Sequence, residues 1–233
     1  MTIAERFKQL TDDIRDSALK AGRDPASIHI VAVSKRHPVS RVQEAVSAGI
    51  QVFGENRVQE AVTKATECAH LNLEWHMIGH LQRNKVKQAA RVFHAIHSLD
   101  SIALADQLND ELGKQKRTMR AFIQVKLSPE MTKTGLDEDA IEALVTHVYR
   151  LPNLNLVGLM GMPPFTEDAE ASAPYFHKLR QLQESLNAGA CRENPLTHLS
   201  MGMSHDFRVA IREGATYIRI GTLLFGERNY VGI

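Results

Sequence analysis

The chain has 233 residues, of which 43% are hydrophobic, enough for one sizeable core and close to the length of a single α/β barrel domain. Its 28 lysines and arginines balance 27 aspartates and glutamates, so a formal net charge of +1 gives no global field that would attract nucleic acid or an anionic membrane. The two cysteines match neither a disulfide framework nor a metal-binding spacing, which is typical of a reducing compartment. We therefore expect one domain, residues 1–233, in a cytoplasmic protein that is a monomer.

Residues 1–21 predict an amphipathic helix that packs on the domain. Its apolar residues recur at spacings of four and three: Ile3, Phe7, Leu10, Ile14 and Ala18. Acidic residues lie between them, and no continuous apolar stretch resembles a signal peptide. No later segment approaches the roughly 20 apolar residues that cross a bilayer, so we expect no membrane role.

Beyond this helix, apolar segments rich in β-branched residues alternate with helical patterns. The expected strands cover residues 28–34, 51–54, 74–79, 92–98, 120–126, 155–160, 198–201 and 216–220. The expected helices cover residues 39–48, 57–68, 84–91, 101–114, 137–149, 169–186 and 205–212. Strict alternation implies right-handed βαβ crossovers and a parallel sheet.

At this length a parallel sheet of eight strands closes most economically into a barrel. We expect a single-domain (β/α)₈ TIM barrel preceded by one extra helix. The alternative is a doubly wound open sheet, in which a glycine-rich nucleotide-binding turn would follow the first strand. That turn reads Ser34-Lys35-Arg36-His37-Pro38 and contains no glycine, which favours the barrel.

Lys35 ends the first predicted strand, and barrels carry their active sites at the C-terminal ends of the strands. A lysine beside a ligand cavity is a candidate Schiff-base nucleophile, because desolvation disfavours the ammonium form and frees the amine to attack a carbonyl. Two alternatives stay open. Charged residues often end strands simply because strands end at water, and Lys126, which ends the fifth predicted strand, is a rival nucleophile.

The loops after the seventh and eighth predicted strands are rich in small and hydroxyl residues, in the part of a barrel that commonly holds a phosphate. Small residues let the backbone approach an anion, hydroxyls add donors, and a short helix starting near Thr222 would aim its amides at the same place. We expect Ser200, Gly221 and Thr222 to cradle a phosphate. The alternative is ordinary turn glycines, with Ser204 capping the next helix.

Arg219 lies within the eighth predicted strand, where alternation places it with Tyr217 toward the barrel interior. A guanidinium in that position needs a partner. One possibility is a structural ion pair with an acidic residue such as Glu55 or Asp100. The other is a ligand acceptor, for instance a ring nitrogen.

A Schiff-base lysine, a phosphate cradle and an arginine aimed at a heterocyclic nitrogen together describe a site for pyridoxal 5′-phosphate (PLP). The sequence also resembles the pyridoxal phosphate homeostasis proteins, which share the alanine racemase barrel. The matching motifs are Ala32-Val33-Ser34-Lys35, Phe53-Gly54-Glu55-Asn56 with Val58-Gln59-Glu60, Trp75-His76-Met77-Ile78-Gly79 with Leu81-Gln82 and Asn84-Lys85, Lys133-Thr134-Gly135, Gly158-Leu159-Met160, Leu199-Ser200-Met201-Gly202-Met203-Ser204 with Asp206, and Ile218-Arg219-Ile220-Gly221-Thr222 with Phe225-Gly226. They occur in family order from the first strand to the last.

This resemblance implies a fold similar to the N-terminal domain of alanine racemase and a role for each candidate residue. Lys35 would hold PLP as a Schiff base, Arg219 would face the pyridine nitrogen, and Asn56 would lie beside the ring. The phosphate would be bound by Ser200, Gly221 and Thr222. Asn56 with Gln59 also fits a helix-capping pair, so its role stays open.

The resemblance further implies a PLP-binding protein of vitamin B6 and amino-acid homeostasis, without strong catalysis of its own, whose partners are PLP and PLP-dependent apo-enzymes. Racemisation needs two positioned acid/base groups, and the chain ends too soon after the last strand for the extra β-domain that supplies the second in racemases. Arg219 would also leave the ring nitrogen unprotonated and the ring a weak electron sink.

Two enzyme alternatives stay open. One is a small amino-acid racemase using Lys35 with Tyr217 or His76. The other is a class I aldolase-like barrel that uses the lysine without a cofactor. We expect no metal site, because no carboxylate or thiolate completes a zinc set around the histidine pairs 76/80 and 94/97.

Overall fold

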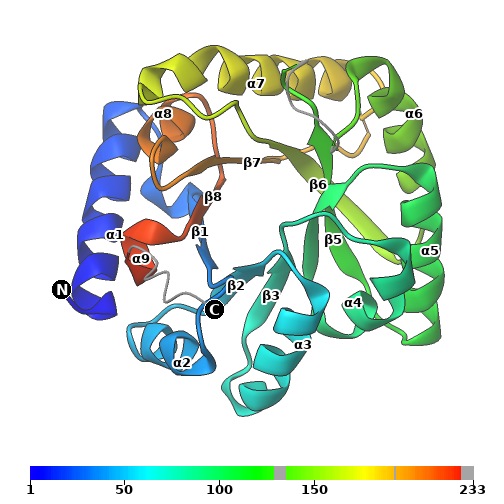
Figure 1. Cartoon of the computed structure of the whole chain (residues 1–233). Coiled ribbons are helices and arrows are strands. Elements are labelled where there is room, and N and C mark those ends of the chain that lie inside the picture. The colour runs from blue at the N-terminus through cyan, green and yellow to red at the C-terminus, as the bar shows by residue number, and fades with distance from the viewer. Residues whose placement is uncertain (129–134, 192, 227–233) are drawn as a thin grey trace.

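The computed structural model describes residues 1–128, 135–191 and 193–226 and forms a closed barrel of eight parallel strands in chain order (Figure 1). The strands are β1 His29–Val33, β2 Val52–Glu55, β3 Glu74–Met77, β4 Ala95–Leu99, β5 Met119–Val125, β6 Leu154–Gly161, β7 His198–Met203 and β8 Tyr217–Ile220. Closure comes from parallel pairing of β1 with β8, in register from His29 opposite Tyr217 to Ala32 opposite Ile220. The predicted (β/α)₈ barrel is confirmed.

Helices surround the strands (Figure 1). They are α1 Ile3–Lys20, α2 Val39–Ser47, α3 Val58–Glu67, α4 Val86–Val92, α5 Ile102–Lys114, α6 Glu138–Val148, α7 Ala173–Ala188, α8 Phe207–Arg212 and α9 Thr222–Phe225. Short 3₁₀ turns add η1 Pro25–Ser27, η2 Ala69–Leu71, η3 Arg83–Lys85 and η4 Ala169–Ser172. Within the described residues, no helix is long and apolar enough to cross a membrane.

The extra helix α1 begins at a capping box, in which the Thr2 side chain accepts from the Glu5 N–H and the Glu5 carboxylate accepts from the Thr2 N–H. The buried residues of α1 are Ile3, Leu10, Ile14 and Ala18. This face packs on α8 and α9, the last two helices in the described part of the chain (Figure 1). The N-terminal helix therefore supports the segment that follows β8.

The core of the barrel has two layers, and each contains its own apolar cluster. The larger cluster is continuous and fills the layer between strands and helices, and we call it the outer layer. The smaller cluster, inside the strands, contains Val31, Phe122, Met160 and Tyr217. Four buried polar residues also line up across the interior: His76, His97, Ser200 and Arg219.

Several element boundaries differ from the prediction for a physical reason. The segment 92–94 was expected in the fourth strand, but Val92 is the last residue of α4, and the Phe93 N–H still bonds the Ala89 carbonyl. Its apolar residues belong to the helix face, so composition alone could not separate helix from strand. The helix expected at 205–212 begins only at Phe207, because Asp206 closes a turn onto Met203. Lys133 and Thr134 of one motif lie outside the described residues.

Candidate functional site

A cavity of about 470 Å³ opens at the C-terminal ends of the strands, within the roughly 300–1,000 Å³ typical of ligand pockets. Five of the six residues expected to bind the cofactor line it: Lys35, Asn56, Arg219, Gly221 and Thr222. They come from the ends of β1, β2 and β8, which closure makes neighbours. Sequence segments almost 190 residues apart therefore meet in one site.

A buried ion-pair network fixes the backbone just before Lys35. The Lys64 ammonium donates to the Ser34 carbonyl and to Glu55 and Glu60 carboxylates, each at 2.7 Å. The Ser34 hydroxyl donates to Glu55 at 2.6 Å. Burial raises the pKa of Glu55, an effect opposed by its contact with Lys64. The network holds the end of β1, and so the start of the Lys35 side chain, against α3.

The chain turns sharply directly after Lys35. Arg36 has a φ of 63°, in the left-handed region that non-glycine residues rarely adopt. Its N–H donates to the Glu60 carboxylate, which already accepts from Lys64. This strained turn is held by the same network, and the residues directly after Lys35, Arg36 and His37, do not line the cavity.

Arg219 is buried at the floor of the cavity, 4% exposed. One terminal nitrogen donates to the Ser200 carbonyl at 2.8 Å and to the Ser200 hydroxyl at 2.7 Å, and the other donates to the Gly161 carbonyl at 3.2 Å. Burial lowers the Arg219 pKa to about 10, with a weaker opposing effect from Asp206. The guanidinium therefore stays charged at neutral pH while its orientation is fixed.

The ion pair considered for Arg219 is not the one observed. Glu55 pairs with Lys64 at 2.7 Å, and Asp100 lies 3.4 Å from the His80 ring nitrogen. The acceptors that face Arg219 are neutral oxygens of Ser200 and Gly161. Neutral acceptors leave its positive charge available to an acceptor in the cavity.

Ser200, inside β7, and Ser204, directly after it, occupy different places. Ser200, expected on the phosphate, is fully buried and does not line the cavity; its hydroxyl contacts Arg219 and His97. Ser204 lines the cavity, where its oxygen accepts from the Gly221 N–H at 3.2 Å and the Leu223 N–H at 3.5 Å. It caps no part of α8, contrary to the alternative, and its own hydrogen can be donated into the cavity.

The wall opposite these loops is formed by Asn56 and Gly79. A β-carbon at Gly79 would lie 2.6 Å from the Asn56 carbonyl oxygen, so only glycine permits this close approach. Helix α3 begins at Val58 without a side-chain cap, so the alternative capping role of Asn56 is not seen. Asn56 instead lines the cavity.

The rival groups from the sequence lie elsewhere. Lys126 does not line this cavity and is 3.6 Å from the Asp137 carboxylate. Tyr217 and His76, considered as second bases, are buried inside the barrel below the cavity; the Tyr217 hydroxyl accepts from Arg120. Among the residues described, no cluster of three potential metal ligands occurs.

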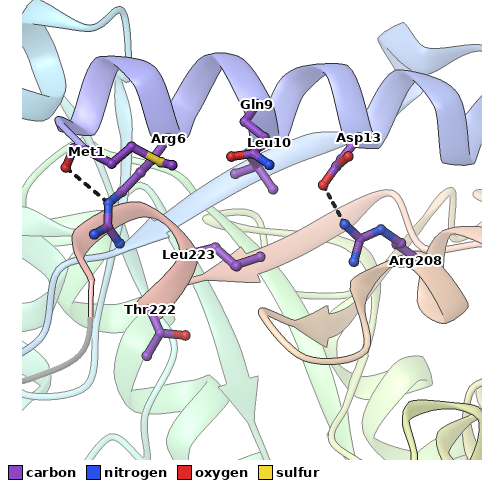
Figure 2. A pocket seen from close by; sticks show the side chains of 8 residues that line it. All are labelled: Met1, Arg6, Gln9, Leu10, Asp13, Arg208, Thr222 and Leu223. Atoms are coloured by element: carbon purple, nitrogen blue, oxygen red, sulfur yellow. Dashed lines mark hydrogen bonds and ion pairs between the residues drawn. The ribbon is translucent and has the colours of Figure 1, made fainter.

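A second cavity lies on the other side of α9, between it and α1 (Figure 2). Figure 2 shows Leu223 on the side of the segment that faces Leu10 of α1 and Thr222 pointing away from α1, with an ion pair between Asp13 and Arg208 at one end. Its lining contains neither Lys35 nor Arg219. Thr222 lines both cavities, so α9 separates the candidate site from this outer groove.

The comparisons with known proteins agree with this geometry. The family model "Alanine racemase, N-terminal domain" matches residues 6–229. An alanine racemase from Clostridium difficile has the same fold, with a TM-score of 0.72 at 12% identity over 94% of this chain and 60% of its own. The barrel with its site at the strand ends thus defines a protein of the alanine racemase N-terminal domain class.

Much closer relatives specify the family. The "Pyridoxal phosphate homeostasis protein" of Aquifex aeolicus is 43% identical over 99% of this chain and its own full length, and that of Escherichia coli is 38% identical over 98% and 97%. The structure of PipY of Synechococcus elongatus with PLP bound has a TM-score of 0.85 at 40% identity, covering 96% of this chain and all of its own. The chain belongs to the family of pyridoxal phosphate homeostasis proteins.

Proposed function

We propose that this protein binds PLP covalently through Lys35 and serves PLP homeostasis by holding and delivering the cofactor. One observation carries the proposal: Lys35 and the charged, fixed Arg219 line the same cavity from the neighbouring strands β1 and β8. When bound, the cofactor supplies an aldehyde that condenses with a lysine amine. The relatives named for PLP homeostasis, and PipY with its bound PLP, support the same conclusion.

Each residue of the cavity has a separate task in this proposal. Arg219 donates to the ring nitrogen, and Asn56 borders the ring. Ser204, Gly221 and Thr222 form the wall that receives the phosphate, with hydroxyl donors and a backbone unshielded by a β-carbon at Gly221. Ser200, expected on the phosphate, acts instead through Arg219, whose guanidinium it holds at 2.7 Å.

The positions of the two candidate second bases support a protein that holds the cofactor and does not turn over amino acids. Neither Tyr217 nor His76 lines the cavity. An arginine at the ring nitrogen does not readily give up a proton, so the ring stays a weak electron sink for a carbanion. Among the described residues that line the cavity, the imidazoles of His80 and His205 are the acid/base groups that a racemase would use instead. Turnover of D- and L-alanine by pure protein, lost in Lys35→Ala, would favour that enzyme.

The direct test is the absorption spectrum of protein mixed with PLP. We expect wild type to give a visible band that Lys35→Ala lacks entirely and that Lys126→Ala retains, since Lys126 lies outside the cavity. Borohydride reduction followed by peptide mapping should place the label on Lys35. A colourless wild type, or a band unaffected by Lys35→Ala, would refute the proposal; lysine-dependent chemistry without PLP would favour an aldolase-like barrel.

The proposal includes PLP-dependent apo-enzymes as recipients and the cytoplasm as location. Two buried free thiols, Cys68 and Cys191, support a reducing compartment. Loaded protein and an apo-enzyme held on opposite sides of a dialysis membrane should reactivate the apo-enzyme more slowly than the mixed proteins if delivery needs contact. Equal rates would restrict the role to buffering free PLP.

A further inference from the structure

A continuous chain of hydrogen bonds runs through the barrel from the opposite mouth to Arg219. At its start, Glu74, the first residue of β3, lies 2.6 Å from His76 Nε2. His76 Nδ1 is 2.9 Å from His97 Nε2, and His97 Nδ1 is 2.7 Å from the Ser200 hydroxyl, which contacts Arg219 at 2.7 Å. His76, His97 and Ser200 are fully buried, whereas the Glu74 side chain is 33% exposed. The chain therefore joins solvent at the far mouth to the floor of the cavity.

The protonation of the two imidazoles follows from their surroundings. Burial lowers the pKa of His76 to about 3, and burial, together with the neighbouring His76 and the Arg219 guanidinium, lowers the pKa of His97 well below its ordinary value. Both rings are therefore neutral at neutral pH, so each has one nitrogen that donates and one that accepts.

Other ionisable groups reach the chain from the remaining strands. Tyr217 of β8 packs against both rings, with centroids 6.0 and 5.8 Å away. Arg120 of β5 pairs with Glu74 and donates to the Tyr217 hydroxyl. His29 of β1 and His198 of β7 contact Tyr217, and burial lowers the pKa of each. None of these groups donates a proton into the His76–His97 contact.

Counting donors then fixes the direction of every bond. A carboxylate paired with Arg120 only accepts, so His76 Nε2 carries hydrogen and His76 Nδ1 accepts. His97 Nε2 must then donate to His76, which leaves His97 Nδ1 to accept from the Ser200 hydroxyl. The lone pairs of Ser200 consequently face Arg219, which can only donate.

We propose that Glu74, His76, His97 and Ser200 form a positioning relay that orients Arg219 as the donor to the ring nitrogen of bound PLP. The relay rests on the proposed function, since it acts on the cofactor through Arg219 alone. Glu74 sets its direction from the opposite mouth of the barrel. If the hydrogen bonds of the relay ran in the reverse direction, the Ser200 hydrogen would point toward the guanidinium, and Arg219 would lose one of its hydrogen-bond acceptors.

The test compares PLP with its 1-deaza analogue, in which a C–H group replaces the ring nitrogen. The variant is His76→Phe, which frees His97 to donate toward Ser200. Its matched control is His198→Phe, the same change inside the same barrel but outside the relay. Dissociation constants are read from the Lys35-dependent absorption band, and thermal unfolding reports folding.

We expect His76→Phe to raise the dissociation constant of PLP about fivefold and that of the deaza analogue less than about twofold, since one hydrogen bond to a charged group is weakened. The His198→Phe control should not discriminate between the ligands. A general structural defect would weaken both ligands equally and would overturn the relay.

Ser200→Ala keeps the test decisive if His76→Phe does not fold. Loss of the hydroxyl should weaken PLP about tenfold but spare the deaza analogue, and Ser200→Thr should restore binding. A serine that touched the phosphate directly would give equal losses for both ligands, which would contradict the relay. A wild type without the Lys35-dependent band overturns the proposed function itself, whereas a normal band with no ligand discrimination overturns only the relay.

Discussion

The two layers of the barrel core differ in composition and therefore in what they contribute to the protein. Between strands and helices one apolar cluster is continuous around the molecule, whereas inside the strands a small apolar cluster, with four buried members among the described residues, shares the space with the relay and Arg219. Apolar packing is non-directional and tolerates many arrangements of similar volume, but a polar chain requires every partner in place. The outer layer therefore holds the fold, and the interior determines the geometry of the site.

The largest expected effects come from substituting a matched pair of phenylalanines, one in each layer. Phe53 faces the outer layer beside Trp75, and Phe122 lies inside, stacked on His97 at 4.2 Å. We expect Phe53→Ala and Phe122→Ala each to lower the free energy of unfolding by about 3–5 kcal/mol, measured in urea. Only Phe122→Ala should also weaken PLP relative to the deaza analogue. If both variants changed the affinity for PLP relative to the deaza analogue equally, the two layers would not differ in their effect on the site.

The pH dependence of stability tests the interior more finely. Unfolded histidines titrate near pH 6.5, whereas the pKa of His76 is lowered to about 3 by burial. Below pH 6.5 the unfolded chain thus binds a proton that the folded chain excludes, so the free energy of unfolding falls as the pH falls. Above pH 6.5 His76 is neutral in both the folded and the unfolded chain, so this loss of stability disappears.

His76→Phe should therefore flatten the pH dependence of stability. The free energy of unfolding, measured in urea from pH 7 to pH 5, should lose a slope approaching about 1.4 kcal/mol per pH unit toward the acid end. The remaining slope should come from His97, His29, His94 and His198, whose pKa values burial also lowers. Parallel profiles for wild type and variant would mean that His76 is protonated inside the barrel.

The smallest effect concerns the two sides of α9. Ser204→Ala removes one hydroxyl from the cavity wall, so the dissociation constant of PLP should rise about five- to tenfold while the lysine-dependent band persists. Arg208→Ala, in the outer groove of Figure 2, removes an exposed partner of Asp13 and should change the constant less than twofold. Binding titrations of both variants measure this; a comparable loss in Arg208→Ala would extend the site across α9.

The sequence predicted the barrel because strand and helix periodicities alternate without interruption, and it placed Lys35, Arg219 and Gly221 at strand ends, where the topology brings them together. It predicted Ser200 rather than Ser204 in the phosphate cradle, whereas Ser204 is the serine that lines the cavity. Between the two serines lies Gly202, whose φ of 90° is in the left-handed region and changes the direction of the backbone.

The relay was missed because its members belong to different strands. Their meeting depends on register, with His76 opposite Ala95, which leaves His97 on the same inward face two residues further along. One signal was present in the sequence. Glu74 and His76 are two residues apart in a strand, so both point to one face, and a polar face within an otherwise apolar barrel indicates a buried network.

The pairing of β1 with β8 has a consequence for synthesis of the chain. Lys35 emerges from the ribosome almost 190 residues before Arg219, Gly221 and Thr222, and the apolar face of α1 packs on α8 and α9 only after those helices have also emerged. Contacts of such sequence separation form late in folding. A nascent chain therefore lacks a complete candidate site until β8 has left the ribosome and paired with β1.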